Sequence, residues 1–336
     1  MGTSGNPHKP HLSTPLSVMK ASRSRVLVFL MCFTCIGVYL KTGYHFTDYA
    51  VDQKLCACIK CLSEDKQLLL DRSNRSVQPF LTANLNLSQN EFNWWKDLQT
   101  ERRSFRVYET TVANLFQMFP RNPDVIQPKY GHCRTCAVVG NSGNLRRSHY
   151  GPLIDLHEVV IRMNTGITRG FEKDVGNKTT HRVMYPESAV DLDDNTHFVL
   201  FPFKIQDFEW LIKASTTGFT GRSYMPVQSK IKANKDLVMV VNPAFMKYVH
   251  EVWLGYRGLY PSTGFMALIL ALHICDEVDV FGYGADSNGN WSHYWEILKN
   301  KNLRTGVHAG KYEYDIIRRL AQQQKIKFYE GIMKKI

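Results

Sequence analysis

Two histidines near the C-terminal end of the chain are the residues best suited to proton chemistry. His293 opens the run His293-Tyr-Trp-Glu296, and His308 opens His308-Ala-Gly-Lys-Tyr-Glu313. An imidazole has an unperturbed pKa of about 6.5, so it can accept or donate a proton near neutral pH. One ring is suited to taking a proton from a hydroxyl, and the other to neutralising a leaving phosphate. A lone histidine is usually a satisfied polar residue, but two in loops after the last expected strands favour catalysis.

A glycine-rich turn is the second feature with chemical potential. It lies in Cys136-Ala-Val-Val-Gly-Asn-Ser-Gly-Asn144, where residues 137–139 are typical of a short buried strand. We expect a helix to start near Leu145 with Asn144 as its cap. A strand, a turn and a helix in this order present free N–H groups to an anion such as a nucleotide phosphate. The alternative is a plain strand-to-helix connection.

A second helix start has the same character. Tyr260-Pro-Ser-Thr-Gly264 leads into an apolar stretch that ends at Cys275, and Ser262 or Thr263 can cap that helix. Its N-terminus could meet a phosphate or carboxylate, although an ordinary capped core helix is about equally consistent with the local sequence. The next strand runs into another glycine turn, Gly282-Tyr-Gly-Ala-Asp286.

Alternating strands and helices must position these residues. The pattern predicts a single Rossmann-like α/β domain with a mostly parallel sheet of about seven strands and helices on both faces. In such sheets ligands bind beyond the carboxyl ends of the strands, which here are polar and glycine-rich. The expected strands are 137–139, 159–163, 181–185, 198–201, 237–241, 278–282 and 326–329. The expected helices are 92–98, 207–214, 243–254, 264–275 and 312–323.

The charge of the chain favours an anionic partner. Its 336 residues carry a formal net charge of +12 with a pI near 9.2. The basic residues form no long runs and no nucleic-acid-binding motif is present, so a small charged substrate is preferred over nucleic acid.

The N-terminus predicts a membrane-anchored protein. We expect a cytosolic tail over 1–25, a transmembrane signal-anchor over 26–42, a stem over 43–55 and a luminal catalytic domain over 56–336. The uncharged stretch 26–40 is short for a bilayer that takes about 20 residues, and it suits a thinner internal membrane. The preceding basic residues place the tail in the cytosol. A cleaved signal peptide is the alternative, but no small-x-small pattern follows Leu40.

Cysteines and glycosylation sequons agree with a luminal domain. An even count outside the membrane segment is typical of three disulfides, with their connectivity open. Zinc is the competing interpretation, because two Cys-x-x-Cys spacings are present. The cysteines concerned are Cys56, Cys58, Cys61, Cys133, Cys136 and Cys275. The sequons lie at Asn74, Asn86, Asn177 and Asn290.

These motifs together resemble the eukaryotic sialyltransferases, and the resemblance covers nearly the whole chain. The large motif corresponds to 136–180, the small motif to 261–286, the third to His293-Tyr-Trp-Glu296 and the very small one to His308 through Glu313. Four motifs in the right order and spacing are highly specific. Trp94-Trp95, Val183-Met-Tyr-Pro-Glu-Ser188 and Pro202-Phe-Lys204 are similar to β-galactoside α-2,3-sialyltransferases, closest to those acting on Galβ1,3GalNAc.

The resemblance implies a GT-A-like variant of the predicted fold. It also implies an inverting transfer of sialic acid from CMP-sialic acid to the 3-hydroxyl of galactose. His308 would be the general base, and His293 would assist the departing phosphate. The implied donor contacts are Asn141, Ser142, Asn164, Ser262, Thr263, Gly264, Gly282 and Gly284, and the implied acceptor contacts are Gln99, Tyr224 and Tyr260. The implied disulfides are Cys56–Cys61, Cys58–Cys133 and Cys136–Cys275.

The resemblance also implies partners and a compartment. The acceptors would be galactose-terminated O-glycans of glycoproteins and glycolipids, and the enzyme would be a type II protein of the Golgi membrane. No metal or other cofactor is expected, because the leaving group is a monophosphate. Asp191-Leu-Asp193 has the spelling of a metal-binding Asp-x-Asp but sits in a polar segment, and we interpret it as a solvated turn.

Ser292 occupies a position where close relatives often have a histidine, and it creates the sequon at Asn290. A glycan there would crowd the acceptor, so we predict that Asn290 is unoccupied or points away, while Asn74, Asn86 and Asn177 are the glycosylation candidates. Three alternatives remain: transfer to Galβ1,4GlcNAc, a catalytically silent glycan-binding relative, or a methyltransferase-like nucleotide fold. The last leaves the anchor, the sequons and the two histidine loops unexplained.

Overall fold

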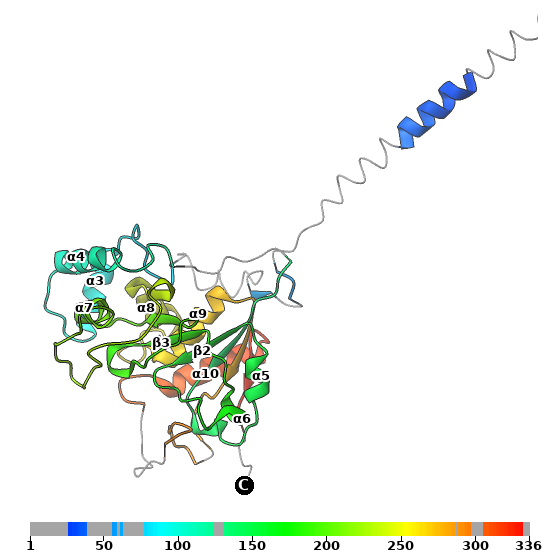
Figure 1. Ribbon diagram of the computed structural model, residues 1–336. Helices are drawn as coiled ribbons and strands as arrows, with labels where there is room; N and C mark the ends of the chain where they lie inside the picture. The colour runs from blue at the N-terminus through cyan, green and yellow to red at the C-terminus, as the bar shows by residue number, and fades with distance from the viewer. Residues whose placement is uncertain are drawn as a thin grey trace, which may run out of the picture. The chain divides into compact units, whose positions relative to one another are not determined.

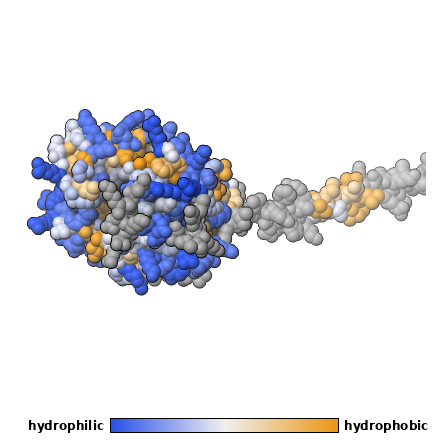
Figure 2. Space-filling model, turned by 90° about the horizontal axis from the view of Figure 1, so that it is seen from below, coloured by the Kyte–Doolittle hydropathy of each residue, from blue (hydrophilic) through white to orange (hydrophobic). Residues whose placement is uncertain are grey.

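The structure is a computed structural model that describes residues 26–38, 56–58, 61–62, 77–123, 131–286, 288–296 and 305–331. The chain divides into two compact units, Met1–Lys54 and Leu55–Ile336. In the first unit, residues 26–38 form a helix with exposed apolar side chains (Figure 2). Among the residues described, no helix combines the length and apolarity needed to cross a membrane. The expected tail, the residues of the expected anchor beyond 38 and the stem lie outside the described residues.

The second unit is built on one parallel sheet of seven strands, in the order β5-β4-β3-β2-β1-β6-β7. The predicted parallel α/β sheet is therefore confirmed. Parallel strands buried on both faces appear in a sequence as short apolar runs, which is why all seven were predictable. The strands are β1 (Thr135–Val139), β2 (Val159–Met163), β3 (His181–Met184), β4 (His197–Leu200), β5 (Val238–Val240), β6 (Glu277–Phe281) and β7 (Lys327–Tyr329).

The strand order creates a switch point in the middle of the sheet. From β1 the chain moves outward on one side through β2 to β5, and it then returns to place β6 on the other side of β1. Connections on the two sides of β1 therefore diverge at its carboxyl end. In open α/β sheets this divergence leaves the crevice in which ligands bind. The turns after β1, β2 and β6 are the ones predicted to carry the site.

Helices cover both faces of the sheet (Figure 1). Side chains alternate along β1, so that Val138 packs in the larger core with α9, whereas Ala137 and Val139 pack in a smaller core with Ile154 and Val175 of α5 and α6. The α-helices are α3 (Gln89–Asp97), α4 (Phe105–Leu115), α5 (Gly151–Asp155), α6 (Glu172–Val175), α7 (Ile205–Ala214), α8 (Pro243–Tyr248), α9 (Thr263–Ile274) and α10 (Gly310–Gln322). Short 3₁₀ turns are η2 (Gly143–Leu145), η3 (Pro186–Ser188) and η4 (Lys235–Leu237), and η5 (Val249–Trp253) is a π-helical segment.

Helix α9 is the central element of the larger core. It is apolar around its whole circumference, nine of its residues are buried, and it packs on β1, β2, β3 and β6. The disulfide Cys136–Cys275 joins the start of β1 to the residue that follows α9. Disulfides also join Cys56 to Cys61 and Cys58 to Cys133, and these are the three pairs that the resemblance implied.

An aromatic layer from the N-terminal part of the domain packs beside the sheet. Helix α3 starts with a capping box between Ser88 and Glu91, and α3 packs on α8 while α4 packs on α7. Trp95 is completely buried and donates its indole N–H to the carbonyl of Pro202 at 2.9 Å. The expectation that the aromatic residues of 92–98 are mainly core is confirmed for Phe92 and Trp95.

One predicted helix start was wrong. No α-helix starts near Leu145: residues 143–145 form only the 3₁₀ turn η2, whose cap is Ser142, and α5 begins at Gly151. The side chain of Asn144 instead donates to the carbonyl of Tyr283 at 2.7 Å. The predicted helix 243–254 is likewise shorter, because α8 ends at Tyr248 and continues as the π-helical segment η5.

A buried histidine predicts that acid weakens the fold. His181 on β3 stacks against the ring of His197, and its Nδ1 lies 2.9 Å from the hydroxyl oxygen of Thr180. Burial, with His197 and Arg134 nearby, lowers the pKa of His181 to about 3. The unfolded chain takes up this proton near pH 6.5 and the folded chain does not. Stability from His181 is thus complete above pH 6.5 and falls by about 1.4 kcal/mol per pH unit as the pH drops toward 3.

Urea unfolding at pH 7, 5.5 and 4.5 measures this loss. We expect His181→Phe, which keeps an aromatic ring against His197, to show a shallower decline than the wild type. His149→Asn is the matched control, because His149 is exposed. Its φ is 59°, a left-handed conformation that Asn tolerates. Equal slopes in wild type and His181→Phe would contradict the assignment.

Candidate active site

A cavity of about 320 Å³ lies at the carboxyl ends of β1, β2 and β6. Its volume is within the range of small-molecule binding sites. Every donor-contact, acceptor-contact and catalytic residue predicted from the sequence lines this one cavity. These residues are Gln99, Asn141, Ser142, Asn164, Tyr224, Tyr260, Ser262, Thr263, Gly264, Gly282, Gly284, His293 and His308.

The turn after β1 holds the site together but does not present its N–H groups as predicted. The N–H of Gly140 donates to Phe281 at 2.7 Å, that of Ser142 to Gly282 at 3.0 Å, and that of Gly143 to Ser292 at 2.8 Å. The expectation of a free anion-binding turn is therefore wrong for these three groups. They are used to join the β1 turn to the β6 turn and to the segment that carries His293.

The hydroxyl of Ser142 is also used in hydrogen bonds within the protein. It donates to the carbonyl of Gly284 at 2.7 Å and accepts the N–H of Asn144 at 3.2 Å. Ser142 thus braces two loops of the cavity, and its hydroxyl hydrogen is not available to a ligand in this arrangement.

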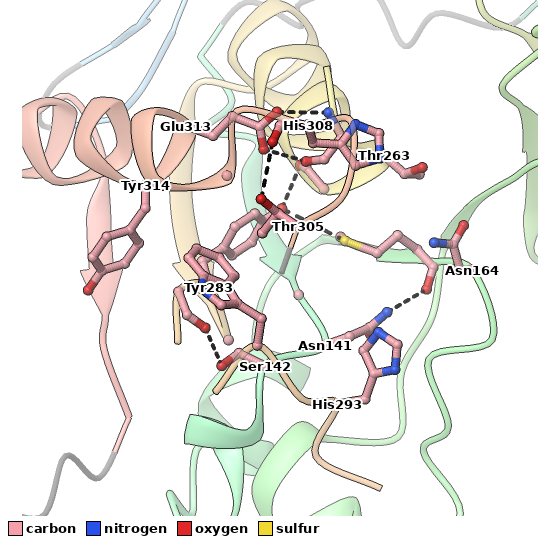
Figure 3. Close-up of a pocket in the computed structure, with 18 of the residues that line it drawn as sticks. Asn141, Ser142, Asn164, Thr263, Tyr283, His293, Thr305, His308, Glu313 and Tyr314 are labelled. Atoms are coloured by element: carbon pink, nitrogen blue, oxygen red, sulfur yellow. Dashed lines mark hydrogen bonds between the residues drawn. The ribbon is translucent and has the colours of Figure 1, made fainter. Parts of the chain in front are cut away.

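Two asparagine amides remain as polar groups directed at the cavity (Figure 3). The Nδ2 of Asn141 donates one hydrogen to the carbonyl of Met163 at 3.3 Å, which leaves its second hydrogen. The Oδ1 of Asn164 accepts the hydroxyl of Ser188 at 3.0 Å, so the amide is oriented with Nδ2 outward. Asn164 has a φ of 52°, a left-handed conformation that asparagine adopts more readily than most residues. These amides can donate to phosphate oxygens where the backbone turn cannot.

The N-terminus of α9 supplies further donors. Ser262 caps the helix by accepting the N–H of Phe265 at 3.1 Å, and its own N–H and hydroxyl donate to the carboxylate of Glu313 at 2.8 and 2.6 Å. Within the described part of the chain, the N–H groups of Thr263 and Gly264 have no partner. The first turn of a helix is favourable for an anion, so this end of α9 can meet one.

Glu313 is a site residue whose role the sequence did not predict. It is buried, and burial raises the pKa of its carboxyl group, while the hydrogen bonds from Ser262 and the nearby His308 oppose that rise. The carboxylate joins the first turn of α10 to the first turn of α9 (Figure 3). The sequence feature that could have indicated this role is the position of Glu313 five residues after His308.

His308 is held in place by contacts with Tyr260 and Thr305. Its Nδ1 lies 3.0 Å from the carbonyl oxygen of Tyr260, and its ring packs edge-on against the Tyr260 ring with centroids 5.0 Å apart. A carbonyl can only accept, so Nδ1 carries the hydrogen and a neutral ring has its lone pair on Nε2. The hydroxyl of Thr305 donates to the His308 carbonyl at 3.1 Å and steadies the loop. The ring is thus arranged as a proton acceptor on the cavity wall.

His293 is placed by the turn after β1. A β-bridge pairs it with Ser142, and the N–H of the next residue, Tyr294, donates to the carbonyl of Asn141 at 2.9 Å. Its ring stacks on Trp295, and Nδ1 lies 2.8 Å from the carboxylate of Glu296. That carboxylate compensates the charge that the ring carries when it donates from Nε2. Figure 3 shows His293 beside Asn141, with His308 at the other end of the cavity.

The predicted acceptor contacts lie on one wall together with aromatic residues that the sequence did not single out. Tyr185 and Phe203 also line the cavity, and the Phe203 ring contacts that of Tyr260 at 5.1 Å between centroids. Lys204 lies 5.7 Å from the centre of the Tyr224 ring and forms ion pairs with Glu187 at 3.1 Å and with Asp207 at 2.8 Å. Aromatic faces and fixed charges of this kind suit a sugar, which has apolar faces and polar edges.

One substitution in the β1 turn tests this packing. A methyl group on Gly140 would lie 2.2 Å from the backbone oxygen of Gly282, which cannot move without displacing the β6 turn. We expect Gly140→Ala to destabilise the domain by about 1–3 kcal/mol and to lower kcat/KM by about 100-fold. Gly143→Ala is the control, because its methyl group would meet only Ser292, at 3.3 and 3.4 Å. Thermal unfolding and initial rates measure both variants, and a Gly140→Ala enzyme equal to Gly143→Ala would refute the close packing.

The remaining predicted features lie away from the cavity. Asp191 and Asp193 are exposed and accept the backbone N–H groups of Lys232 and Asn195, so this Asp-x-Asp is a turn, as interpreted from the sequence. Among the described residues, the clusters with metal-ligand spacing are built on Cys56, Cys58, Cys61 and Cys133. These sulfurs are joined in disulfides and offer no thiolate, which favours the disulfide interpretation over zinc.

The sequons differ in exposure. Asn86 and Asn177 are exposed, and Asn74 lies outside the described residues. Asn290 is half-buried, and its Nδ2, the atom that would carry a glycan, donates to Asp286 at 3.2 Å. This contact supports the prediction that Asn290 is unoccupied, which stays a prediction.

Comparison with known proteins gives a consistent result. Residues 80–325 match the model of glycosyltransferase family 29 (sialyltransferase). The chain is 46% identical over 282 residues to a CMP-N-acetylneuraminate-beta-galactosamide-alpha-2,3-sialyltransferase 1 of Sus scrofa, covering 82% of each chain. It is 45% identical over 282 residues to the sialyltransferase 2 of the same description from Mus musculus, covering 82% of this chain and 80% of the relative.

A more distant relative carries a different acceptor in its name. It is the CMP-N-acetylneuraminate-beta-1,4-galactoside alpha-2,3-sialyltransferase of Mus musculus, 33% identical over 213 residues, which are 58% of this chain and 57% of the relative. The fold is similar to a crystal structure of a mammalian sialyltransferase, with a TM-score of 0.76 and 46% identity over 82% of this chain and 99% of that one. A structure of a mammalian sialyltransferase in complex with Gal-beta-1-3GalNAc-ortho-nitrophenol matches with a TM-score of 0.75.

Proposed function

Because the chain belongs to glycosyltransferase family 29, the sialyltransferases, we propose that it transfers sialic acid from CMP-sialic acid to the 3-hydroxyl of terminal galactose in Galβ1,3GalNAc. The observation that carries the mechanism is that His308 and the two asparagine amides line one cavity from different sides. One side can deprotonate a sugar while the other holds a phosphate. The names of the most similar relatives support the linkage and the acceptor.

His308 is the proposed general base. Because its Nδ1 hydrogen is given to Tyr260, Nε2 is free to accept the proton of the galactose 3-hydroxyl as that oxygen attacks. Proton removal during attack keeps positive charge from building on the nucleophilic oxygen. Tyr260 therefore sets the orientation of the base as well as lining the acceptor end of the cavity.

The leaving phosphate is assigned to the other end. Asn141 and Asn164 donate to its oxygens, and His293 donates to it as negative charge grows. The carboxylate of Glu296 lies 2.8 Å from Nδ1 and holds the His293 ring in place for this donation. A base and a leaving-group site at opposite ends of the cavity suit a single in-line displacement, which inverts the configuration at the anomeric carbon.

Partners and location are part of the same proposal. The acceptors are galactose-terminated O-glycans of glycoproteins and glycolipids, and no metal takes part because no diphosphate has to be held. The disulfides support an oxidising compartment. The uncharged segment beginning at Val26 supports anchoring as a type II protein of the Golgi membrane, with the catalytic domain in the lumen.

Linkage analysis of the product tests the proposal. The purified enzyme is incubated with CMP-sialic acid and either Galβ1,3GalNAc or Galβ1,4GlcNAc, with and without EDTA. We expect an α-2,3-linked product with the first acceptor, at an unchanged rate in EDTA. A clear preference for Galβ1,4GlcNAc would replace the acceptor assignment, and glycan binding without CMP release would identify a catalytically silent relative.

A further inference from the structure

Two arginines on neighbouring strands are buried close to the donor end of the cavity. Arg162 on β2 and Arg182 on β3 are register partners, and their exposed fractions are 1% and 8%. Each keeps one buried guanidinium nitrogen without a hydrogen-bond partner, Nη1 in Arg162 and Nε in Arg182. Within the described ranges neither arginine forms an ion pair with a carboxylate. A pair of cations without anions is unusual inside a protein.

Both side chains stay charged in spite of their burial. Burial lowers the pKa of each guanidinium to about 10, which is still far above neutral pH. Removing such charges from water is costly unless an anion or well-placed dipoles compensate them. Backbone carbonyls provide part of that compensation here. An anionic ligand in the adjacent cavity would provide more compensation, but only to an arginine whose guanidinium group is directed toward that cavity.

The two guanidinium groups form hydrogen bonds at opposite ends of the strands. Arg162 donates to the carbonyls of Val175 and Lys178, in the connection that precedes β3. Arg182 donates from Nη1 to the carbonyls of Gly166 at 3.0 Å and Asn164 at 3.3 Å, in the loop that follows β2. The loop that follows β2 lies at the carboxyl ends of the strands, where the cavity lies. Of these two arginines, Arg182 is therefore the one directed toward the donor site.

Gly166 lies between the guanidinium group of Arg182 and the side-chain amide of Asn141. A methyl group on Gly166 would lie 2.8 Å from Nη1 of Arg182, 3.0 Å from the carbonyl of Met163 and 3.3 Å from Oδ1 of Asn141. The positive charge therefore lies directly behind Asn141 and Asn164. Arg182 also holds the carbonyl of Asn164, whose φ of 52° needs support from its surroundings.

We propose that Arg182 is a positioning residue for the donor phosphate: it fixes the left-handed Asn164 and places a buried positive charge behind the two asparagine amides. This inference rests on the proposed function, because it needs a phosphate at that end of the cavity. Arg182 does not touch the ligand. Its effect reaches the phosphate through Asn164 and through a short distance of low-dielectric protein.

A comparison of CMP with cytidine tests the inference, because the two ligands differ only in the phosphate. Isothermal titration calorimetry gives the ratio of their Kd values for the wild type, Arg182→Met, Arg182→Lys and Arg162→Met. We expect Arg182→Met to weaken CMP binding by about tenfold while the Kd for cytidine changes by less than about twofold. Arg182→Lys retains the charge and should recover most of the ratio. Arg162→Met, equally buried but directed away, should leave the ratio unchanged.

The outcomes separate the inference from the proposed function. A wild type that binds CMP no better than cytidine overturns the phosphate site and the proposed function with it. A wild type that prefers CMP, combined with an unchanged ratio in Arg182→Met, overturns the role of Arg182 alone. Equal weakening of CMP and cytidine also overturns it, because that result indicates a merely structural arginine. Circular dichroism checks folding, and Arg182→Gln replaces the Met variant if the latter does not fold.

Discussion

Replacing His308 with alanine is expected to lower turnover by about 10²–10⁴-fold, the range for loss of a general base. The affinity for CMP should change by no more than about twofold, because His308 is at the acceptor end of the cavity and the asparagine amides are at the other. The hydrogen bond from Nδ1 to Tyr260 orients a lone pair that alanine cannot replace. CMP release and CMP titration on the same preparation measure the two quantities.

His149→Asn is the control for His308→Ala, since His149 is an exposed histidine outside the cavity and Asn tolerates its φ of 59°. It should leave turnover close to that of the wild type. A His308→Ala enzyme with normal turnover would remove the proposed base from the mechanism. A variant that loses CMP affinity along with turnover would place His308 at the donor end and contradict the geometry argued above.

Removing the disulfide between Cys136 and Cys275 is expected to cost about 5 kcal/mol of unfolding free energy. The bridge closes a loop of 139 residues, and in the chain-entropy treatment the stabilisation grows with the logarithm of loop length. A loss of this size approaches the whole stability of many domains. The bridge also fixes the start of β1 against the end of α9, so both walls of the donor site depend on it.

The double variant Cys136→Ala/Cys275→Ala avoids a free thiol and is compared with Cys56→Ala/Cys61→Ala. The second bridge spans only five residues, so its loss should cost about 2 kcal/mol by the same treatment. Urea denaturation under non-reducing conditions gives both values. A smaller loss for the long bridge than for the short one would show that entropy of the unfolded chain does not explain the stabilisation.

The sheet was predictable because its strands are defined by local sequence. Runs such as Val159 to Ile161 are apolar and β-branched, and each is followed by polar or glycine residues. Helices α4, α5 and α6 are missing from the expected helices. For α5 and α6 the reason is their length, because five and four residues carry too little of the 3.6-residue period to be distinguished from a loop. The π-helical end of α8 was missed for a related reason, since its apolar pattern continues without interruption.

The members of the site were predictable, but several of their roles were not. Motif order brought His293, His308 and Asn141 to one cavity. Which hydrogen bond each group makes depends on tertiary neighbours: the N–H of Gly140 is used by Phe281, and the hydroxyl of Ser262 by Glu313. A local pattern shows that a turn has N–H groups, and it does not show whether another loop has already taken them. Arg182 was missed because its importance comes from contacts with Asn164 and Gly166 that only the fold brings about.

The most direct test is a crystal structure of the enzyme with CMP and Galβ1,3GalNAc bound together. We expect the phosphate within about 3 Å of the Asn141 and Asn164 amides, and the galactose 3-hydroxyl within about 3 Å of Nε2 of His308. CMP bound away from the ends of β1, β2 and β6, or a galactose whose 3-hydroxyl faces a residue other than His308, would contradict the account.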